Sequence, residues 1–483
     1  MMDELIEAGL AYLNKAKVPY GEIRIEERED ESLDVKNGKT ESFSKAQNAG
    51  FGARVLLNGA WGFASSNILT EQSIEEAVKK AVEIAKASAK FLKHEVKLAP
   101  EQAYQASYKT PVQKDPFTVS PKEKIALLKE ATERMRKVRR IELAQGSMNF
   151  WRVKKYFGNT DGSRITQELI TSGAGIVVTA IGAGEMQKRS YPSSFGGDFS
   201  NAGYEFIESL RLLDHAEEIA KEAAALLDAP PCPSGRFDLI IGSAQLALQI
   251  HESFGHPSEL DRVLGTEISF AGGSFLTLDK RGKFQYGSKL VNITGDATLP
   301  GGLGTFGFDD EGVPAQKYPM VKDGIFVNYS TSRETAVAIG EKRSNGTARA
   351  SGWNRIPLIR MTNISLEPGN ATLEDLIADT KDGLFVDINK SWSIDDKRLN
   401  FQFGTEFARE VKNGQLGRLL KNPIYTGITP EFWCSCVAIA NRDYWCLWGL
   451  PNCGKGQPGQ VMQVGHGASP AKFANVQVMG TKV

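Results

Sequence analysis

The sequence predicts an α+β protein: an N-terminal α/β half of hairpins and long helices, then a mainly β C-terminal domain carrying a helix with candidate metal ligands. Three observations predict this class. Residues 22–63 hold short alternating apolar runs that break at Asn58-Gly59, which is typical of a β-hairpin. Long amphipathic helical patterns gather before residue 229. The chain after the candidate helix is dense in glycine, threonine and short apolar runs, which favours a barrel or a sandwich with inserted helices.

The elements of the N-terminal half follow from apolar periodicity and capping residues. An apolar stripe over residues 1–17 indicates an amphipathic first helix. Ser73 and Glu76 form a capping box ahead of a second helix, and Ser120 with Pro121 at the first helical position starts a third. The expected elements are a helix over 1–17, strands over 22–63, helices over 73–91 and 120–138, strands over 141–156 and 169–180, and a helix over 204–227.

The length of 483 residues exceeds the size at which one hydrophobic core keeps growing, so we expect two or three domains. A segment rich in proline and glycine before residue 237 is the clearest linker in the chain. The expected organisation is an N-terminal α/β domain over 1–105, a central α/β region over 106–228, a linker over 229–236 and the C-terminal mainly β domain over 237–483.

The C-terminal domain opens with a strand and a short helix. Leu246, Ile250 and Phe254 recur at four-residue intervals and give this helix a core face, with Ser243 as its expected N-cap. Thr372 precedes a second short helical pattern. The elements expected here are therefore a strand over 238–242, the helix that follows it, and a helix over 373–378.

Composition excludes several classes of function. The 58 basic and 58 acidic residues give a formal charge of zero, so no direct contact with nucleic acid is expected. Residues 1–17 lack the basic start and unbroken apolar core of a signal peptide, and no run reaches the roughly 20 apolar residues of a membrane span. Five cysteines, an odd number, argue against a disulfide framework. We expect a soluble, cytoplasmic protein without a membrane partner.

His251-Glu252-Ser253-Phe254-Gly255-His256 is the most informative stretch for chemistry. It sets a carboxylate beside one of two imidazoles, as the activation of water by zinc requires, and it indicates a metallopeptidase. The alternative interpretation is that one Glu and two His lie on a buried helix by chance and bind no metal. Only five histidines occur in the chain, which makes two of them within six residues less accidental.

The spacing of these histidines makes a structural demand. Residues five apart diverge by roughly 140° on a regular α-helix, so both rings cannot face one ion. The helix must therefore widen by a π-type bulge, or end near Gly255 and Pro257. The histidines are then expected at its C-terminal end.

Asp309, Asp310 and Glu311 are a second candidate for metal binding, because three carboxylates in a row suggest Ca²⁺ or Mg²⁺. Neighbours along a strand point to alternate faces, so the three cannot all face one ion without a turn. We favour a turn or surface loop over a cation site.

Several stretches along nearly the full chain resemble the TldD/PmbA family, and specifically its metal-binding TldD-type members. The stretches that carry the resemblance are Asn58 to Ala64, Asp309 to Pro314, Arg360 to Asn363, Arg418 to Pro423 and Asn452 to Lys455. Together with the histidine motif they are far more specific than that motif alone.

The resemblance implies a peptidase whose zinc is held by His251, His256 and Cys453, with Glu252 as the general base that activates zinc-bound water. Three protein ligands leave a fourth position open, as in catalytic zinc sites. From the residues alone Cys453 is more readily interpreted as a small buried hydrophobe, the usual environment of an intracellular cysteine. The other four cysteines, His466 and Glu259 compete with it for the role of third ligand.

The resemblance also implies partners. Family members assemble as dimers, so we expect a homodimer or a heterodimer with a PmbA/TldE-like paralogue that lacks the motif. The implied substrate is an unfolded or short peptide held by main-chain pairing to a β-edge. The strand-rich stretch 310–330 offers either such an edge or an ordinary hairpin. The chain departs from the family at Pro257, where glycine is common, and in an extra histidine, His466.

Two rival functions remain open beside the metallopeptidase. One is a catalytically silent interaction or regulatory protein of the same fold, since family members have been described as modulators of DNA gyrase. The other is a hydrolase that uses Cys453 as nucleophile, which needs a nearby base such as His466. The set of His251, Glu252, His256 and Cys453 favours the metallopeptidase.

Overall fold

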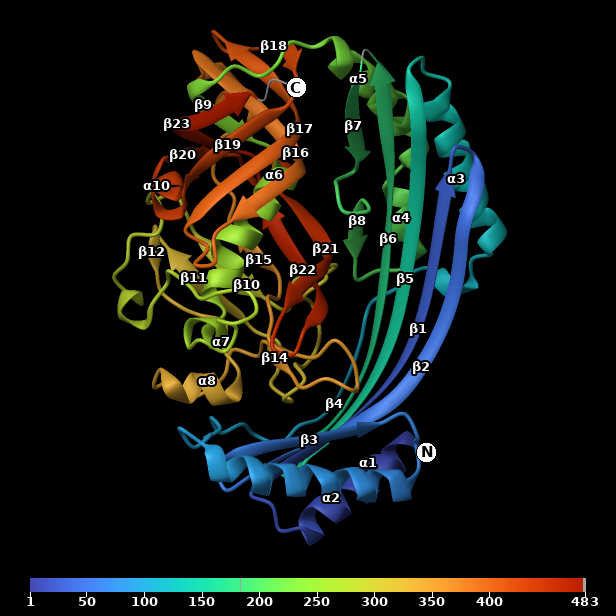
Figure 1. Cartoon of the computed structure of the whole chain (residues 1–483), viewed down its shortest axis with the longest axis vertical. Coiled ribbons are helices and arrows are strands. Elements are labelled where there is room, and N and C mark those ends of the chain that lie inside the picture. The colour runs from blue at the N-terminus through green and yellow to red at the C-terminus, as the bar shows by residue number, and fades with distance from the viewer. Residues whose placement is uncertain (183, 481–483) are drawn as a thin grey trace.

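The computed structural model describes residues 1–182 and 184–480, and the chain forms two halves (Figure 1). The N-terminal half is a long curved sheet with helices on its outer side. The C-terminal half is a mainly β domain that lies along the inner side of that sheet (Figure 1). The α+β fold class predicted from the sequence is confirmed.

Four unusually long strands dominate the N-terminal sheet. They pair in the order β2-β1-β5-β6, with every pairing antiparallel. The strands of this sheet are β1 (Tyr20–Lys36), β2 (Lys39–Leu57), β3 (Ala60–Ser66), β4 (Gln105–Lys109), β5 (Ile141–Asn159), β6 (Arg164–Gly182), β7 (Glu185–Tyr191) and β8 (Asp198–Ser200). Asn58 and Gly59 both have positive φ in the turn between β2 and β3, which confirms the predicted hairpin.

Two separate helix layers cover the two ends of the outer face. Helices α1 (Met2–Lys15) and α2 (Glu71–Ser88) pack on the end of β1 that carries Ile23 and Ile25. Helices α3 (Pro121–Arg136) and α5 (Leu212–Asp228) pack on the end that carries Leu33 and Val35. Each layer thus has its own hydrophobic core on one continuous sheet.

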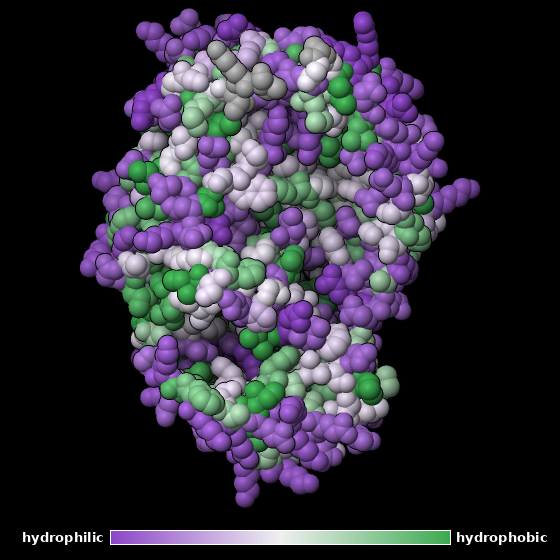
Figure 2. Space-filling model, viewed as in Figure 1, coloured by the Kyte–Doolittle hydropathy of each residue, from purple (hydrophilic) through white to green (hydrophobic). Residues whose placement is uncertain are grey.

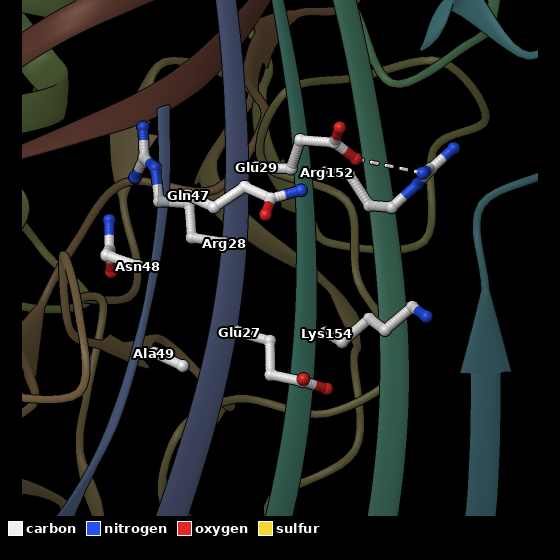
Figure 3. A pocket seen from close by; sticks show the side chains of 8 residues that line it. All are labelled: Glu27, Arg28, Glu29, Gln47, Asn48, Ala49, Arg152 and Lys154. Carbon is white, nitrogen blue, oxygen red and sulfur yellow. Dashed lines mark hydrogen bonds and ion pairs between the residues drawn. The ribbon is translucent and has the colours of Figure 1, made fainter. Parts of the chain in front are cut away.

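The middle of the outer face lies between these layers and is polar. Glu27 and Glu29 of β1, Gln47 of β2 and Arg152 of β5 line a shallow pocket of about 390 Å³ there (Figure 3). The Arg152 guanidinium donates to Glu29 at 3.0 Å. The side chains of a strand alternate between faces, so Glu26 faces the other side of the sheet.

The helix starts test the capping predictions. Ser120 accepts from the backbone N–H of Glu123 and caps α3, as predicted. The predicted cap Ser73 is wrong, because Thr70 accepts from the backbone N–H of Ser73 and starts α2 three residues earlier. The single helix predicted over 204–227 is two helices, α4 (Tyr204–Ser209) and α5, because Arg211 adopts left-handed φ of +50° and breaks the helical path.

Five strands of the C-terminal domain close into a barrel. The ring runs β16-β9-β23-β19-β17 and returns to β16, with β9 and β16 parallel and the other pairs antiparallel. The barrel alternative predicted for this half is confirmed. The strands of this sheet are β9 (Gly235–Ile241), β16 (Asp382–Ile394), β17 (Asn400–Lys412), β18 (Gln415–Leu420), β19 (Pro423–Ile428), β20 (Cys436–Ile439) and β23 (Ala471–Gly480).

Helix α6 (Ser243–Ile250) follows β9 and is buried along its whole length. Its N-cap is Gly242, one residue before the predicted cap Ser243. The Tyr425 hydroxyl of β19 accepts from Gln245 at 2.8 Å and donates to Gln249 at 3.0 Å, which fixes α6 against the barrel. The end of α6 is thereby held inside the largest hydrophobic core of the molecule.

The remaining elements surround α6. They are α7 (Leu260–Val263), β10 (Ile293–Asp296), β11 (Lys317–Lys322), β12 (Ile325–Phe326), α8 (Arg333–Ala338), β13 (Ala348–Arg349), β14 (Leu358–Ile359), β15 (Ile364–Leu366), α9 (Leu373–Ala378), α10 (Thr429–Cys434), β21 (Cys446–Lys455) and β22 (Gln460–Ala468). Strand β11 pairs with β10 on one side and with β12 on the other, so 310–330 holds a hairpin. Thr372 caps α9 as expected. None of the described helices is long and apolar enough to cross a membrane.

The stretch Asp309 to Glu311 is a turn, as favoured from the sequence, but a buried one. The Asp309 carboxylate accepts backbone N–H bonds from Glu311, Val313 and Ala348. Asp310 pairs with Lys155 of β5 at 2.9 Å. We call Asp309, Asp310 and Glu311 the acidic turn; it joins the C-terminal domain to the N-terminal sheet.

Candidate metal centre

The two histidines lie on one widened helical turn. The backbone N–H of His256 donates to the carbonyl of His251, five residues earlier, and a π turn spans His251–Gly255. A 3₁₀ turn, His256–Ser258, follows it. This confirms the π-type bulge predicted from the five-residue spacing. The rings come within 4.9 Å of each other, centroid to centroid, at an interplanar angle of 85°.

The structure brings Cys453 of β21 to these two rings. One ligand atom from each of His251, His256 and Cys453 lies within 4.8 Å of the others, and all three residues are buried. The Sγ of Cys453 is 3.7 Å from Nε2 of His256. Tetrahedral zinc with bonds of about 2.0–2.1 Å to nitrogen and about 2.3 Å to sulfur needs separations of this size, so the donor set fits zinc.

Each imidazole is oriented by a partner on its other nitrogen. His466 donates from Nδ1 to the carbonyl of Ile364 at 2.9 Å, so its Nε2 is left to accept from Nδ1–H of His251 at 2.8 Å. Nδ1–H of His256 donates to Glu259 at 3.0 Å. Both arrangements leave Nε2 as the lone-pair nitrogen, which is the form that binds a metal.

The charges of the site also suit a metal. Burial lowers the pKa of His251 and holds the pKa of His256 well below its usual value, so both rings are neutral. Burial raises the pKa of the Cys453 thiol, but the Arg360 guanidinium and His256 outweigh it and the pKa is lowered. Neutral imidazoles and an easily ionised thiol are the protonation states that zinc requires.

Glu252 stands beside the ligands and is paired with one cation. Nη1 of Arg398 donates to the Glu252 carboxylate at 2.7 Å, and Glu252 is 6% exposed. Arg398 holds left-handed φ of +63° in the loop between β16 and β17. Non-glycine residues in this strained conformation occur preferentially at functional sites, where the surrounding structure holds them in place.

A buried charge network lies behind His256. The Glu259 oxygen that accepts from His256 is 3.3 Å from Nζ of Lys455. Lys455 also pairs with Asp261 at 2.7 Å and with Glu267 at 3.3 Å. Because Lys455 follows Cys453 on β21, the network fixes the strand of one candidate ligand to the helix turn of the other.

The structure separates the competing ligands. In the described part of the chain, the single group of three or more His, Cys, Asp or Glu residues spaced for a metal is His251, His256 and Cys453. His466 and Glu259 contact the far nitrogens of the two rings instead. His466 thus accepts a hydrogen bond from His251, whereas the imidazole beside the Cys453 thiol is that of His256.

Sequence reasoning missed Arg398 and gave no role to Arg360 or Lys455. Arg398 lies 146 positions from Glu252 and carries no local signal of their pairing. Arg360 and Lys455 stand inside stretches that carried the family resemblance. Arg360 donates to the Cys453 carbonyl at 2.5 Å, and a buried arginine or lysine within a recognised motif is the signal that points to such roles.

Comparisons with known proteins agree with this geometry. Three models of PmbA/TldA metallopeptidase domains match the chain: domain 1 over residues 21–85, the central domain over 114–227 and the C-terminal domain over 234–480. A metalloprotease of Methanocaldococcus jannaschii is 32% identical over 93% of this chain and 94% of its own length. A zinc metalloprotease TldD homolog of Saccharolobus solfataricus is 22% identical over 89% of this chain and 90% of its own.

Solved structures share the fold. A Thermotoga maritima protein described as a candidate modulator of a DNA gyrase has a TM-score of 0.79 at 20% identity, covering 99% of this chain and 100% of its own. TldE from Thermococcus kodakarensis has a TM-score of 0.73 at 17% identity, covering 99% of this chain and 100% of its own. With all three domain models matched in order along it, the chain belongs to the PmbA/TldA metallopeptidase family, as the resemblance to TldD/PmbA proteins predicted.

Proposed function

We propose that this chain is a zinc-dependent peptidase in which His251, His256 and Cys453 hold the metal and Glu252 is the general base. The convergence of three ligand atoms within 4.8 Å, with the remote nitrogen of each imidazole already bonded, carries this proposal. Sulfur and imidazole ligands favour zinc over the hard cations Ca²⁺ and Mg²⁺.

When bound, zinc polarises the scissile carbonyl and lowers the pKa of water to about 7. The Glu252 carboxylate then accepts the proton of the attacking water and delivers it to the leaving amine. Arg398 holds one carboxylate oxygen at 2.7 Å and so fixes the direction of the other. The thiolate of Cys453 would contribute negative charge. Zinc held by it would be a weaker Lewis acid than zinc held by three neutral imidazoles, so more of the activation of water would fall to Glu252.

The proposed substrates are unfolded or short peptides. The residues of the site are only a few per cent exposed, so an extended peptide can reach them where a folded protein cannot enter. The proposed assembly is a homodimer, or a heterodimer with a TldE-like paralogue that lacks the motif. A shared fold with TldE from Thermococcus kodakarensis supports a related partner.

Metal content and peptide cleavage, measured together, test the proposal. We expect one zinc per chain by mass spectrometry of the purified protein and cleavage of an unfolded peptide, alone or with the paralogue. Glu252→Gln is expected to keep the zinc and to lower kcat by about 10²- to 10⁴-fold, because a general base contributes that much. Cys453→Ser is expected to lose both zinc and cleavage.

The outcomes separate the rival functions. Cleavage that survives chelation of the metal but not Cys453→Ser would identify a thiol hydrolase. A chain that binds zinc and cleaves nothing with either partner would contradict the peptidase. A chain without zinc would favour the interaction protein.

A further inference from the structure

A cleft separates the inner face of the N-terminal sheet from the C-terminal domain. Its volume is about 440 Å³. The space-filling view shows the surface recessed along this seam (Figure 2). Residues of β1, β5 and β6 form one wall, among them Glu26, Trp151 and Leu169, and residues of the hairpin β21–β22 form another, among them Pro451 and Met462.

Glu26 is the unusual group in this cleft. It lies on β1 in the middle of the sheet, is 3% exposed and lines the cleft. Within residues 1–182 and 184–480 its carboxylate has neither a hydrogen bond nor an ion pair. Burial raises the pKa of Glu26, and Lys155 and Arg24 oppose this only in part. Buried carboxylates are normally paired, so this one is missing a partner.

The cations around Glu26 are directed elsewhere. Lys155 donates to both oxygens of Asp310 at 2.9 and 3.0 Å. Arg28 donates to both oxygens of Asp30 at 2.8 and 3.0 Å. Arg24 donates to the Arg355 carbonyl at 2.5 Å. Each cation thus bonds an acceptor other than Glu26, although Nε and Nη1 of Arg24 have no hydrogen bond of their own and Nη1 lies 3.7 Å from Asp310. The Glu26 oxygens remain open to a donor that enters the cleft.

The cleft adjoins the candidate metal centre through one hairpin. Met462, which lines the cleft, pairs with Cys453 across β21 and β22. Arg349, on the same wall, donates to the carbonyls of Met361 and Gln463 at 3.0 and 2.9 Å. Met361 in turn packs on the π turn, since a Cβ at Gly255 would meet its sulfur at 2.2 Å. A peptide lying in the cleft therefore runs beside the elements that carry the ligands.

We propose that Glu26 binds an ammonium group of the peptide substrate and so sets which peptide bond reaches the metal centre. This rests on the proposed peptidase function and names its substrate class: peptides with a free amino terminus or a lysine side chain near the cleaved bond. Apolar side chains along the walls, such as Trp151, Leu303 and Val461, then contact the rest of the peptide.

The chemistry favours an ammonium group over other ligands. A carboxylate with its lone pairs free accepts hydrogen bonds and repels anions, and a charge-assisted bond from N–H⁺ is the strongest that it can form. Binding would also remove the cost of the unpaired buried carboxylate. An amino terminus and a lysine side chain supply the same group, so both are tested.

Binding to the catalytically silenced protein separates this proposal from the proposed function. The probes are pentapeptides of alanine and phenylalanine with amidated C-termini: one with a free amino terminus, one acetylated, and one acetylated with a lysine at the first position. Affinities are measured by calorimetry on full-length zinc-loaded Glu252→Gln protein. Glu26→Gln is added to this background, with Glu27→Gln as the matched control because Glu27 lies next on β1 and faces the outer pocket (Figure 3).

The free peptide is expected to bind at least about tenfold more tightly than the acetylated one, since hydrogen bonds to charged groups contribute this much. Glu26→Gln should abolish the difference, and Glu27→Gln should leave it unchanged. If the acetylated lysine peptide matches the free one, either source of the ammonium is accepted. Equal affinity of the free and both acetylated peptides, a difference that survives Glu26→Gln, or no binding of any probe would overturn the proposal, whether or not the parent protein cleaves peptides.

Discussion

The candidate metal centre and the acidic turn invite comparison, because each buries three side chains that can bind a cation. In the metal centre, the bonded nitrogen of each ring points away from the group and Nε2 faces inward. In the acidic turn the carboxylates are already used. Asp309 accepts three backbone N–H bonds, and Asp310 pairs with Lys155.

The difference teaches that partners decide what a buried group can do. Arg54 lies 3.1 Å from Glu311 and 2.9 Å from Glu22, and Lys155 pairs with Asp310, so two of the three carboxylates of the acidic turn have cations within the protein. Among the described residues no lysine or arginine forms an ion pair with the sulfur or the ring nitrogens of the metal centre, and Arg360 beside Cys453 donates to its carbonyl instead. A group of potential ligand residues therefore indicates a metal site only if the neighbouring hydrogen-bond donors and cations leave its ligand atoms free.

Arg54→Met should break the acidic turn and give the largest effect. It leaves Glu22 and Glu311 buried without their cation, which destabilises a protein by about 3–5 kcal/mol. Urea unfolding measures the loss. Zinc content of the variant should equal that of the parent, because no residue of the metal centre touches Arg54.

The matched control adds Glu311→Gln to Arg54→Met. It removes one of the stranded charges and should restore part of the stability. If Arg54→Met alone were as stable as the parent, the buried pairing of Arg54 with Glu22 and Glu311 would not stabilise the protein. Lost zinc in that variant would contradict the separation of the two regions.

His466→Phe should sharpen the comparison from the other side. It removes the acceptor of the His251 Nδ1–H, and loss of such a partner weakens zinc binding by about 10- to 100-fold. Competition with a chromogenic chelator measures the affinity. His466→Gln, whose amide oxygen can accept the same bond, should recover most of it. Equal zinc affinity in His466→Phe and the parent would show that His251 needs no partner.

Sequence patterns predicted the parts of the fold that depend on local chemistry. Asn58-Gly59 predicted a turn because both residues tolerate positive φ, and Thr372 predicted the start of α9 because its hydroxyl caps the helix. The five-residue spacing of His251 and His256, if both rings face one ion, predicted either a π turn or a helix end near Gly255, and the structure has the π turn. The family resemblance pointed to Cys453, which the structure places at the two rings, although the role of each ligand stays a prediction.

Long-range contacts were beyond the sequence. The buried position of the acidic turn depends on β5, about 155 residues away, and Arg398 meets Glu252 only because the barrel loop returns to α6. Ser73 was mistaken for a cap because Thr70, three residues earlier, satisfies the same backbone rule. The break at Arg211 has no glycine or proline to announce it. Such features follow from tertiary packing rather than from spacing.

Asp198 provides the most direct test of the principle, because it is a buried carboxylate for which the described part of the chain supplies no cation. It accepts backbone N–H bonds from Gly449 and Phe199, both at 2.8 Å, and burial raises its pKa to about 7 from 3.8. Protonation is therefore easier in the folded state than in the unfolded chain. Its contribution to stability is complete below about pH 4 and is lost as the pH rises through 7.

Asp198→Asn keeps the accepting oxygen and carries no charge, so its stability should not depend on pH over this range. At pH 8 the variant should be more stable than the parent by about 4 kcal/mol, the free energy of a pKa difference of about three units, and near pH 4 the two should be nearly equal. Urea unfolding at both pH values measures the difference. A variant that is less stable than the parent at pH 8 would show that the ionised carboxylate is favoured at this position. Backbone donors alone would then stabilise a buried charge, as the cations Arg54 and Lys155 do in the acidic turn.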